Sequence, residues 1–281
     1  MVDEQYDRQI RFFGREGHEG IKNAKVVLMG TGGNGIHVVQ QLAYAGATEW
    51  TFVEFDTVAK SNLNRLVGAT ADDLGNPKTD VAIRILKGIN PDAVPEIIAG
   101  KVGDPAIDGD LRDAIADATI VIGCFDKEAP RQTAVKLCSE AGAPYLDLAT
   151  EIISDDDGLI YGGRVVFSHD GTGCLFCLGV IDMNELAREQ MTDEQREQRD
   201  RNYGLTPEEA GDSGPSVVTI NGVVASLACT EALVFIAGLR APARQLTYRG
   251  HDSVVLKNNT QGDPQCLYCT RWRSFLQTDE V

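Results

Sequence analysis

KVVLMGTGGNG, residues 25–35, is an apolar run that ends in a cluster of glycines. The apolar run predicts a buried strand, and Ile36, Val39 and Ala43, which follow at helical spacing, predict a helix. Glycines between a strand and a helix let the backbone turn tightly and approach a nucleotide without a clash from a Cβ atom. The pattern therefore predicts a nucleotide-binding turn, although glycines also occur in purely structural turns. The expected cofactor-binding glycines are Gly30, Gly32, Gly33 and Gly35.

Apolar runs and helical patterns alternate on the C-terminal side of this turn. Further strands are expected at residues 50–55, 94–99, 119–125 and 144–148, and helices at 78–89, 111–116 and 131–141. Such alternation predicts an α/β fold with a doubly wound, Rossmann-like parallel sheet. We expect residues 1–150 to form this nucleotide-binding half.

The pattern changes after residue 150, where residues 158–168 and 246–256 predict an antiparallel extension of the sheet. Between them lie a charged stretch, 182–215, and a long helix expected at 216–237. Residues 151–281 are thus expected to form a C-terminal half with a crossover segment at about 178–215. We expect the two halves to make one integrated domain.

Composition disfavours several classes of protein. The formal net charge of -16 disfavours a nucleic-acid partner or an anionic membrane surface, which attract clustered Lys and Arg. The longest apolar segment, 217–238, contains Ser, Thr, Asn and Glu and does not resemble an uninterrupted membrane span, and the charged N-terminus lacks the apolar core of a signal peptide. We expect a cytoplasmic protein with no nucleic-acid and no membrane partner. The acidity itself is compatible with a solvated surface, salt adaptation or a basic partner.

Polar motifs follow the predicted strands. Glu54 and Asp56 end the second strand, where an acid can accept hydrogen bonds from a ribose. Alone, the glycine turn and these acids would favour NAD or FAD. The chain continues, however, with SNLNR at 61–65, GNPK at 75–78 and GCFD at 123–126.

Together with YDRQIR at 6–11, these motifs resemble, in order and spacing, those of the ThiF/MoeB/HesA family, relatives of the ubiquitin-activating enzymes. The resemblance implies an adenylyltransferase that uses ATP to activate the C-terminal carboxylate of a ubiquitin-like or sulfur-carrier protein ending in Gly-Gly, and releases pyrophosphate. It also implies the roles of individual residues. Glu54 would bind the ribose, Arg65 and Lys78 the phosphates, and Asp126 magnesium. The remaining nucleotide contacts would come from Gly33, Asp56, Ser61, Asn62 and Asn64.

Arg8 resembles an arginine that this family extends into the site of a neighbouring subunit, which implies a homodimer. The chemistry agrees with these roles, because Arg8, Arg65, Lys78 and magnesium can spread the charge that develops when ATP is attacked at its α-phosphorus. No general base is needed, since a terminal carboxylate is ionised at neutral pH. Taken singly, each charged residue could also form an ordinary surface ion pair.

Three positions depart from the usual family pattern. Glu54 replaces Asp, Leu66 replaces Gln, and Lys127 replaces Asn. These changes leave adenylation as the expected reaction but affect the expected contacts to the ribose.

Two CxxC pairs occur in the C-terminal half. Four thiolates at this spacing fit one tetrahedral zinc ion with no open position, which is typical of a structural site. The alternative is that the two CxxC pairs bind no metal. Cys124, Cys138 and Cys229 lie within predicted strand or helices and are expected in the core, and the four histidines show no catalytic spacing. The expected zinc ligands are Cys174, Cys177, Cys266 and Cys269.

Two other functions share some of these features. An NAD- or FAD-dependent oxidoreductase has the glycine turn and the acid, but it would not account for Arg65, Lys78 and Asp126. A non-catalytic nucleotide-binding scaffold of the same family is the other alternative. The sequence leaves the acyl substrate open: sulfur carriers, ubiquitin-like modifiers and small peptides are all compatible. Because residues 178–215 contain no cysteine, we expect the reaction to stop at the adenylate, without a thioester on this chain.

Overall fold

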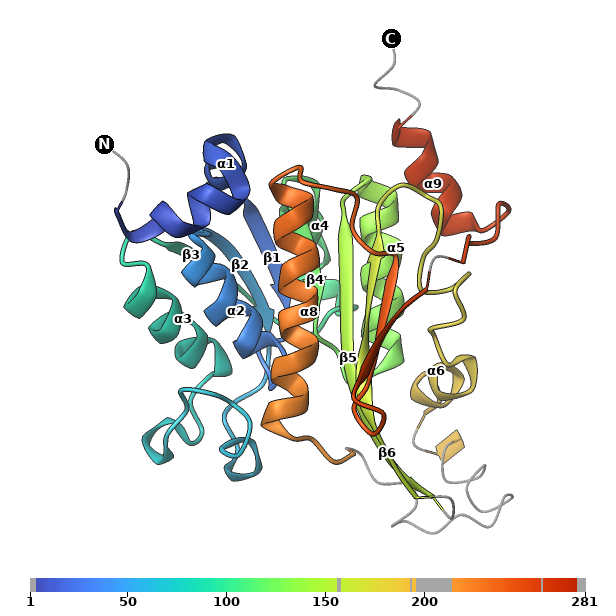
Figure 1. Ribbon diagram of the computed structural model, residues 1–281. Helices are drawn as coiled ribbons and strands as arrows, with labels where there is room; N and C mark the ends of the chain where they lie inside the picture. Colours follow the sequence, from blue (N-terminus) through green and yellow to red (C-terminus); the bar gives the residue numbers. More distant parts are fainter. Residues whose placement is uncertain (1–3, 156–157, 193, 196–213, 259, 277–281) are drawn as a thin grey trace.

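The computed structural model describes residues 4–155, 158–192, 194–195, 214–258 and 260–276 (Figure 1). Most of the charged stretch expected as a crossover segment lies outside them. Within the described residues, eight strands form one sheet in the order β3-β2-β1-β4-β5-β6-β7-β8. The strands are β1 (Lys25–Met29), β2 (Glu49–Glu54), β3 (Val94–Ala99), β4 (Ile120–Gly123), β5 (Tyr145–Asp155), β6 (Gly158–Ser168), β7 (Gln245–Arg249) and β8 (Val254–Asn258).

The sheet is parallel in one half and antiparallel in the other. β1 pairs in parallel with β2 on one side and β4 on the other, and β3 and β5 continue the parallel part outward. From β5 to β8 the neighbours are antiparallel. The predicted fold class, a doubly wound Rossmann-like sheet with an antiparallel extension, is confirmed. Residues 246–256 form two strands rather than one, because the chain reverses before Ser253, whose φ is 55°.

Helices cover both faces of the sheet. Figure 1 shows α2 (Gly35–Ala45), α3 (Lys78–Ile89) and α8 (Val218–Ile236) in front of it, with α4 (Asp108–Ala116) and α5 (Glu128–Ala141) behind. Each helix layer packs on the sheet around its own apolar core. One core lies between the sheet and α2, α3 and α8, and the other lies between the sheet and α4 and α5. The other helices are α1 (Asp7–Lys22), α6 (Met183–Glu189), α9 (Leu267–Leu276) and the short 3-10 turns η1 (Glu4–Tyr6), η2 (Lys60–Asn62), η3 (Ala71–Asp73) and η4 (Pro105–Ile107).

Helix α8 is long and apolar enough, by length and composition, to cross a membrane. By length and composition alone, the expectation that this segment does not resemble a membrane span is therefore not met. In the structure α8 packs against α2, β5 and β6. Val224, Ala225, Ala228 and Ala232 are buried in the apolar core there, so α8 serves as a core helix of the sheet. Its apolar character follows from that packing.

The carboxyl ends of the parallel strands lie along one edge of the sheet. β4 ends at Gly123, which is paired with Asp147 of β5. β5 continues from there to Asp155 with β6 paired along its whole length, and the two strands extend downward in Figure 1. The β5–β6 hairpin therefore forms a wall beside the loops that follow β1, β2 and β4.

Candidate functional site

The glycine turn after β1 is fixed by close backbone contacts. Gly30 has a φ of 92°, and its N–H donates to the Val53 carbonyl at 2.9 Å. A Cβ atom at Gly30 would lie 2.9 Å from the Cys124 carbonyl oxygen, and one at Gly35 would lie only 2.0 Å from the Gly30 carbonyl oxygen. Neither position can accept a side chain without opening the turn.

Glu54 ties this turn to the end of β2. Its Oε2 accepts hydrogen bonds from the N–H of Thr31 at 2.8 Å and from the Thr31 hydroxyl at 3.0 Å. Its Oε1 accepts from the N–H groups of Phe55 and Asp56 at 2.9 and 3.0 Å. A carboxylate has about four acceptor positions, so protein donors fill those of Glu54. The side chain is buried, and the ribose contact implied by the family resemblance stays a prediction.

A cavity of about 850 Å³ extends from the glycine turn to β5. Three of the predicted nucleotide-binding residues, Gly35, Ser61 and Asn64, are not part of its lining, although Ser61 and Asn64 hold Arg65. Arg65 donates to the Ser61 carbonyl and, at 3.1 Å, to Oδ1 of Asn64. The predicted residues that do line the cavity are Gly30, Gly32, Gly33, Glu54, Asp56, Asn62, Arg65, Lys78 and Asp126.

Two cations, Arg65 and Lys78, lie in the same cavity as the glycine turn. Lys78, the first residue of α3, is mostly buried, and its Nζ lies 2.7 Å from Oδ2 of Asp56. The side chain of Arg65 lies beside Gly33, where an added Cβ would be 3.3 Å from the Arg65 Cδ. Both positive charges therefore line the same cavity as the glycine turn.

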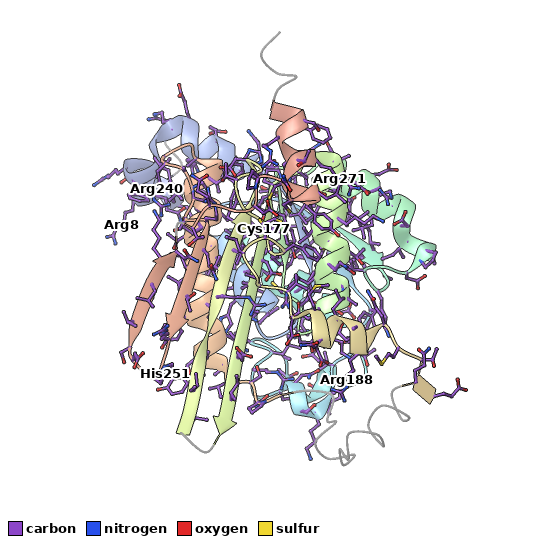
Figure 2. All side chains as sticks on the ribbon, turned by 90° about the vertical axis from the view of Figure 1, so that its right-hand side faces the viewer. Arg8, Cys177, Arg188, Arg240, His251 and Arg271 are labelled. Carbon is purple, nitrogen blue, oxygen red and sulfur yellow. The ribbon has the colours of Figure 1, made fainter. Side chains whose placement is uncertain are left out.

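Arg8 does not reach the cavity of its own chain. It is exposed on α1, beside Gln9, whose side chain donates to the Tyr44 carbonyl at 2.7 Å. Tyr44 lies at the C-terminal end of α2, whereas the glycine turn precedes the N-terminal end of that helix. In Figure 2, Arg8 lies at the opposite end of the molecule from Arg188 of α6. Helix α6 is near the cavity, since Glu189 accepts hydrogen bonds from the N–H groups of Glu128 and Ala129 at the start of α5.

Asp126 follows β4 and is exposed at the cavity. Arg131, which the sequence did not single out, anchors the loop that carries Asp126. Arg131 donates to the Phe125 carbonyl at 2.7 Å, to Glu128 at 2.6 Å and to the buried Asp147 at 3.0 Å. Burial acts to lower the pKa of Arg131, but the two carboxylates outweigh it and raise that pKa above its ordinary value. Removing one partner of such a buried pair costs about 3–5 kcal/mol.

A second set of contacts that the sequence did not reveal links the β5–β6 hairpin to α8. The Thr150 hydroxyl of β5 donates to Oδ1 of Asn221 at 3.0 Å, and Asn221 Nδ2 is 3.1 Å from the Ser216 hydroxyl. A Cβ at Gly33 would lie 2.5 Å from Asn221 Nδ2. Asn221 is 1% exposed, and a buried amide in an otherwise apolar helix was the signal that could have found this contact.

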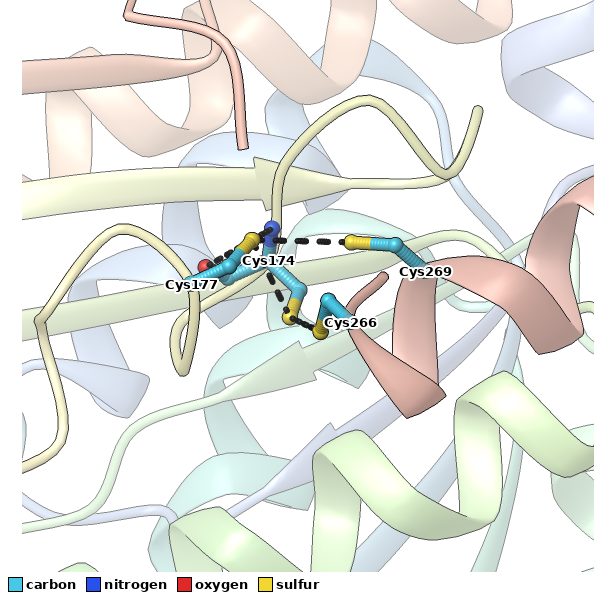
Figure 3. A group of neighbouring side chains, drawn as sticks. All are labelled: Cys174, Cys177, Cys266 and Cys269. Carbon is cyan, nitrogen blue, oxygen red and sulfur yellow. Dashed lines mark hydrogen bonds between the residues drawn. The ribbon is translucent and has the colours of Figure 1, made fainter. Parts of the chain in front are cut away.

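The four cysteines of the CxxC pairs come together (Figure 3), and Cys174 and Cys269 belong to the apolar core on the α5 side of the sheet. The Sγ atoms of Cys174 and Cys177 are 3.8 Å apart, and each lies 3.6 Å from a cysteine of the second pair. All four sulfurs lie within 4.8 Å of one another. A tetrahedron with Zn–S bonds of about 2.3 Å has sulfurs about 3.8 Å apart, so this donor set fits a zinc ion. The first pair is in the loop after β6, and the second, Cys266 and Cys269, is at the start of α9.

A glycine turn, acidic and basic groups and a deep cavity thus meet at the carboxyl edge of a parallel sheet. This arrangement defines a nucleotide-binding α/β protein. Comparison with known proteins specifies the class further. The model of the ThiF family matches residues 6–266. The molybdopterin-synthase adenylyltransferase of Escherichia coli (strain K12) is 32% identical over 242 residues, which cover 85% of this chain and 84% of the relative.

A second relative, the sulfur carrier protein ThiS adenylyltransferase of the same strain, is 27% identical and covers 86% of this chain and 84% of its own length. Among solved structures, E. coli MccB with AMPCPP and MccA matches with a TM-score of 0.73 at 22% identity, over 96% of this chain and 74% of that one. This last likeness supports the fold alone. The chain belongs to the ThiF family, and the expected family and enzyme class, an adenylyltransferase, are confirmed.

Proposed function

We propose that this chain uses ATP to adenylate the C-terminal carboxylate of a small ubiquitin-like or sulfur-carrier protein, most simply one that ends in Gly-Gly. The observation that carries the proposal is that Arg65, Lys78 and Asp126 line one cavity with the glycine turn. The relatives named above support it, because both are adenylyltransferases and one acts on a sulfur carrier. An NAD- or FAD-dependent oxidoreductase has no need of this set of phosphate-directed cations.

Each residue that lines the cavity has its own role in the proposed reaction. The turn at Gly32 and Gly33 lets the phosphates approach the backbone, and Arg65 and Lys78 hold the departing pyrophosphate. The ionised carboxylate attacks the α-phosphorus directly, so no proton has to be removed from it. The exposed carboxylate of Asp126 is suited to a magnesium ion, which would neutralise charge on the phosphates. The buried network of Arg131 and Asp147 keeps the loop of Asp126 in place.

The three cysteines outside the CxxC pairs support an enzyme that stops at the adenylate. Cys138 and Cys229 are fully buried, and burial raises the pKa of both thiols. Cys124 lines the cavity, but burial and the negative charge of Asp147 raise its pKa well above the ordinary value for a thiol. A thiol kept protonated is a poor nucleophile, so we propose that the acyl group passes to an external thiol.

Two further parts of the proposal concern assembly. We propose a homodimer in which Arg8 of one subunit completes the site of the other, because Arg8 is exposed and far from its own cavity. We also propose that the four-cysteine cluster binds a structural zinc ion that joins α9 to the loop after β6. The fit of the sulfur distances to a zinc tetrahedron supports this assignment.

The proposal is tested by ATP–pyrophosphate exchange. The purified protein is assayed alone, with each small protein ending in Gly-Gly encoded in the same genome, and with the same proteins carrying a C-terminal amide. We expect exchange with at least one free acid and none with its amide. Exchange without any partner, or equal exchange with acid and amide, would contradict the proposal. Asp126→Ala, made in parallel, is expected to abolish exchange.

A further inference from the structure

A second arginine that the sequence did not single out, Arg164, lines the same cavity. It lies on β6 opposite Ala149 of β5, two positions beyond Asp147, where β4 ends. Side chains alternate along a strand, so Arg164 lies on the same face as Val166. Val166 is buried in the core that packs against α5. Arg164 therefore enters the cavity from the α5 side of the sheet, just past the end of β4.

Among the residues that the structure describes, none accepts a hydrogen bond from the Nε of Arg164. This nitrogen is buried, and no ion pair joins Arg164 to a carboxylate within the described part of the chain. Of the neighbouring carboxylates, Asp147 and Glu128 are both bound to Arg131. The exposed Glu151 of β5 is also near Arg164 but forms no ion pair with it in the described part of the chain. Burial and the positive charge of Arg131 lower the pKa of Arg164, although an arginine stays protonated at neutral pH. A buried donor left unpaired is costly, and an anion in the cavity would relieve that cost.

The positions of the other cations indicate which anion that is. Arg65 lies beside Gly33 and Asn221, and Lys78 begins α3, so both belong to the side of the sheet covered by α2, α3 and α8. Pyrophosphate held by these two residues would leave toward that side. In phosphoryl transfer the attacking and leaving oxygens are roughly in line. The attacking oxygen must therefore come from the opposite side, which is the α5 side, where Arg164 lies.

We propose that Arg164 binds the attacking carboxylate of the acyl substrate and orients one of its oxygens toward the α-phosphorus of ATP. This inference rests on the proposed function. In the step, the bond between the carboxylate oxygen and the α-phosphorus forms, the bond from that phosphorus to the pyrophosphate oxygen breaks, and its electron pair leaves with pyrophosphate. Arg164 keeps its protons, and after the step it faces the acyl oxygen of the adenylate.

Two stable analogues test this role without knowledge of the natural partner. One is 5′-O-sulfamoyladenosine, and the other is the same compound carrying a glycylglycyl group on its sulfamate nitrogen. Calorimetry of the wild-type protein should show at least about tenfold tighter binding of the acylated analogue, the size expected for hydrogen bonds to a charged donor. Arg164→Gln should reduce this preference to about twofold and leave the affinity for the unacylated analogue unchanged.

Two further variants serve as controls. Arg164→Lys keeps the positive charge but loses the planar guanidinium, so it should show an intermediate preference for the acylated analogue. If Arg164→Gln does not fold, Arg164→Lys tests the role of Arg164 in its place. Arg249→Gln removes an arginine of the same sheet that does not line the cavity and should behave like the wild type. A preference that persists in both Arg164 variants, or an equal loss of affinity for both analogues, would overturn the inference.

Failure of the proposed function would look different. Absence of pyrophosphate exchange with every Gly-Gly carrier would reject the assigned partner, while an Arg164-dependent preference for the acyl group would still stand. Conversely, carrier-dependent exchange at the wild-type rate in Arg164→Gln, together with no acyl preference in the wild type, would reject only the role of Arg164.

Discussion

Glu54 offers the sharpest test of how the nucleotide turn is held. Its two oxygens accept four hydrogen bonds, two from Thr31 and two from the N–H groups of Phe55 and Asp56. The substitution Glu54→Gln keeps the size of the side chain but replaces one acceptor oxygen with an NH₂ donor. Whichever way the amide turns, two of the four protein donors then face another donor.

The expected loss follows from that count. Hydrogen bonds to charged groups contribute about 1.5–3 kcal/mol each, so losing two of them in a buried position should lower the free energy of unfolding by about 3–6 kcal/mol. This is a large part of the 5–15 kcal/mol typical of a folded protein. Because the same bonds set the position of Thr31 in the turn, ATP affinity should fall together with stability.

Urea unfolding measures the first quantity and calorimetric titration with ATP the second. Glu151→Gln is the matched control, because Glu151 lines the same cavity but is exposed and should change stability by less than about 0.5 kcal/mol. Thr31→Val, which removes one bond to the Glu54 carboxylate, should cost about 1.5–3 kcal/mol alone and less than that in the Glu54→Gln background. Unchanged stability of Glu54→Gln with strongly weakened ATP binding would refute this reasoning and assign Glu54 to the ribose instead.

Four further outcomes are expected. Metal analysis should find one zinc ion per chain, and serine at any one of the four zinc-site cysteines should lower the melting temperature. Mixing Arg8→Ala with Lys78→Ala chains should restore part of the exchange activity that each variant lacks. Incubation with ATP and the carrier should give no thiol-sensitive adduct on non-reducing gels, since the pKa of Cys124 is raised by burial. The Arg84 guanidinium holds the pKa of Asp73 well below its ordinary value, so Asp73→Asn should destabilise the protein at neutral pH, and the difference in melting temperature should shrink as pH falls below about 4.

Each of these outcomes can fail in a recognisable way. Protein that is free of metal but fully folded would contradict the zinc site. Mixed chains that exchange subunits but stay inactive would contradict a shared active site. A covalent adduct lost on substitution of Cys124 would identify a nucleophile where we infer a thiol that stays protonated. A melting-temperature difference for Asp73→Asn that is the same at pH 3 and pH 7 would show that its carboxylate is not held ionised by the fold.

The arrangement of the parallel sheet could be predicted from sequence because each strand is an apolar run followed by a helical pattern. The helix starts were less well predicted: α4 begins at Asp108 and α5 at Glu128, three residues before the predicted starts in each case. Polar first turns carry no apolar periodicity, so they hide the true beginning of a helix. Helices α1 and α9 were not predicted, although α1 is amphipathic; it is interrupted by a kink at Gly14, whose φ is 74°.

The loops of the site could be predicted because their motifs are contiguous in sequence. The groups beneath them could not, since Arg131 meets Asp147, and Thr150 meets Asn221, only after the sheet has formed. Arg164 gave no signal of its own in a strand where polar and apolar residues mix. A charged residue in a predicted strand, such as Asp147, indicates a buried partner but does not identify it.

The origin of one oxygen atom tests the central claim most directly. The carrier is prepared with both oxygens of its C-terminal carboxylate replaced by ¹⁸O and is incubated with the protein, ATP and an acceptor thiol. If the carboxylate attacks the α-phosphorus of ATP, the AMP released when the thiol takes the acyl group must contain one ¹⁸O atom, and mass spectrometry should find it. Unlabelled AMP, or ADP in place of AMP, would show that no acyl-adenylate forms and would contradict the proposed reaction.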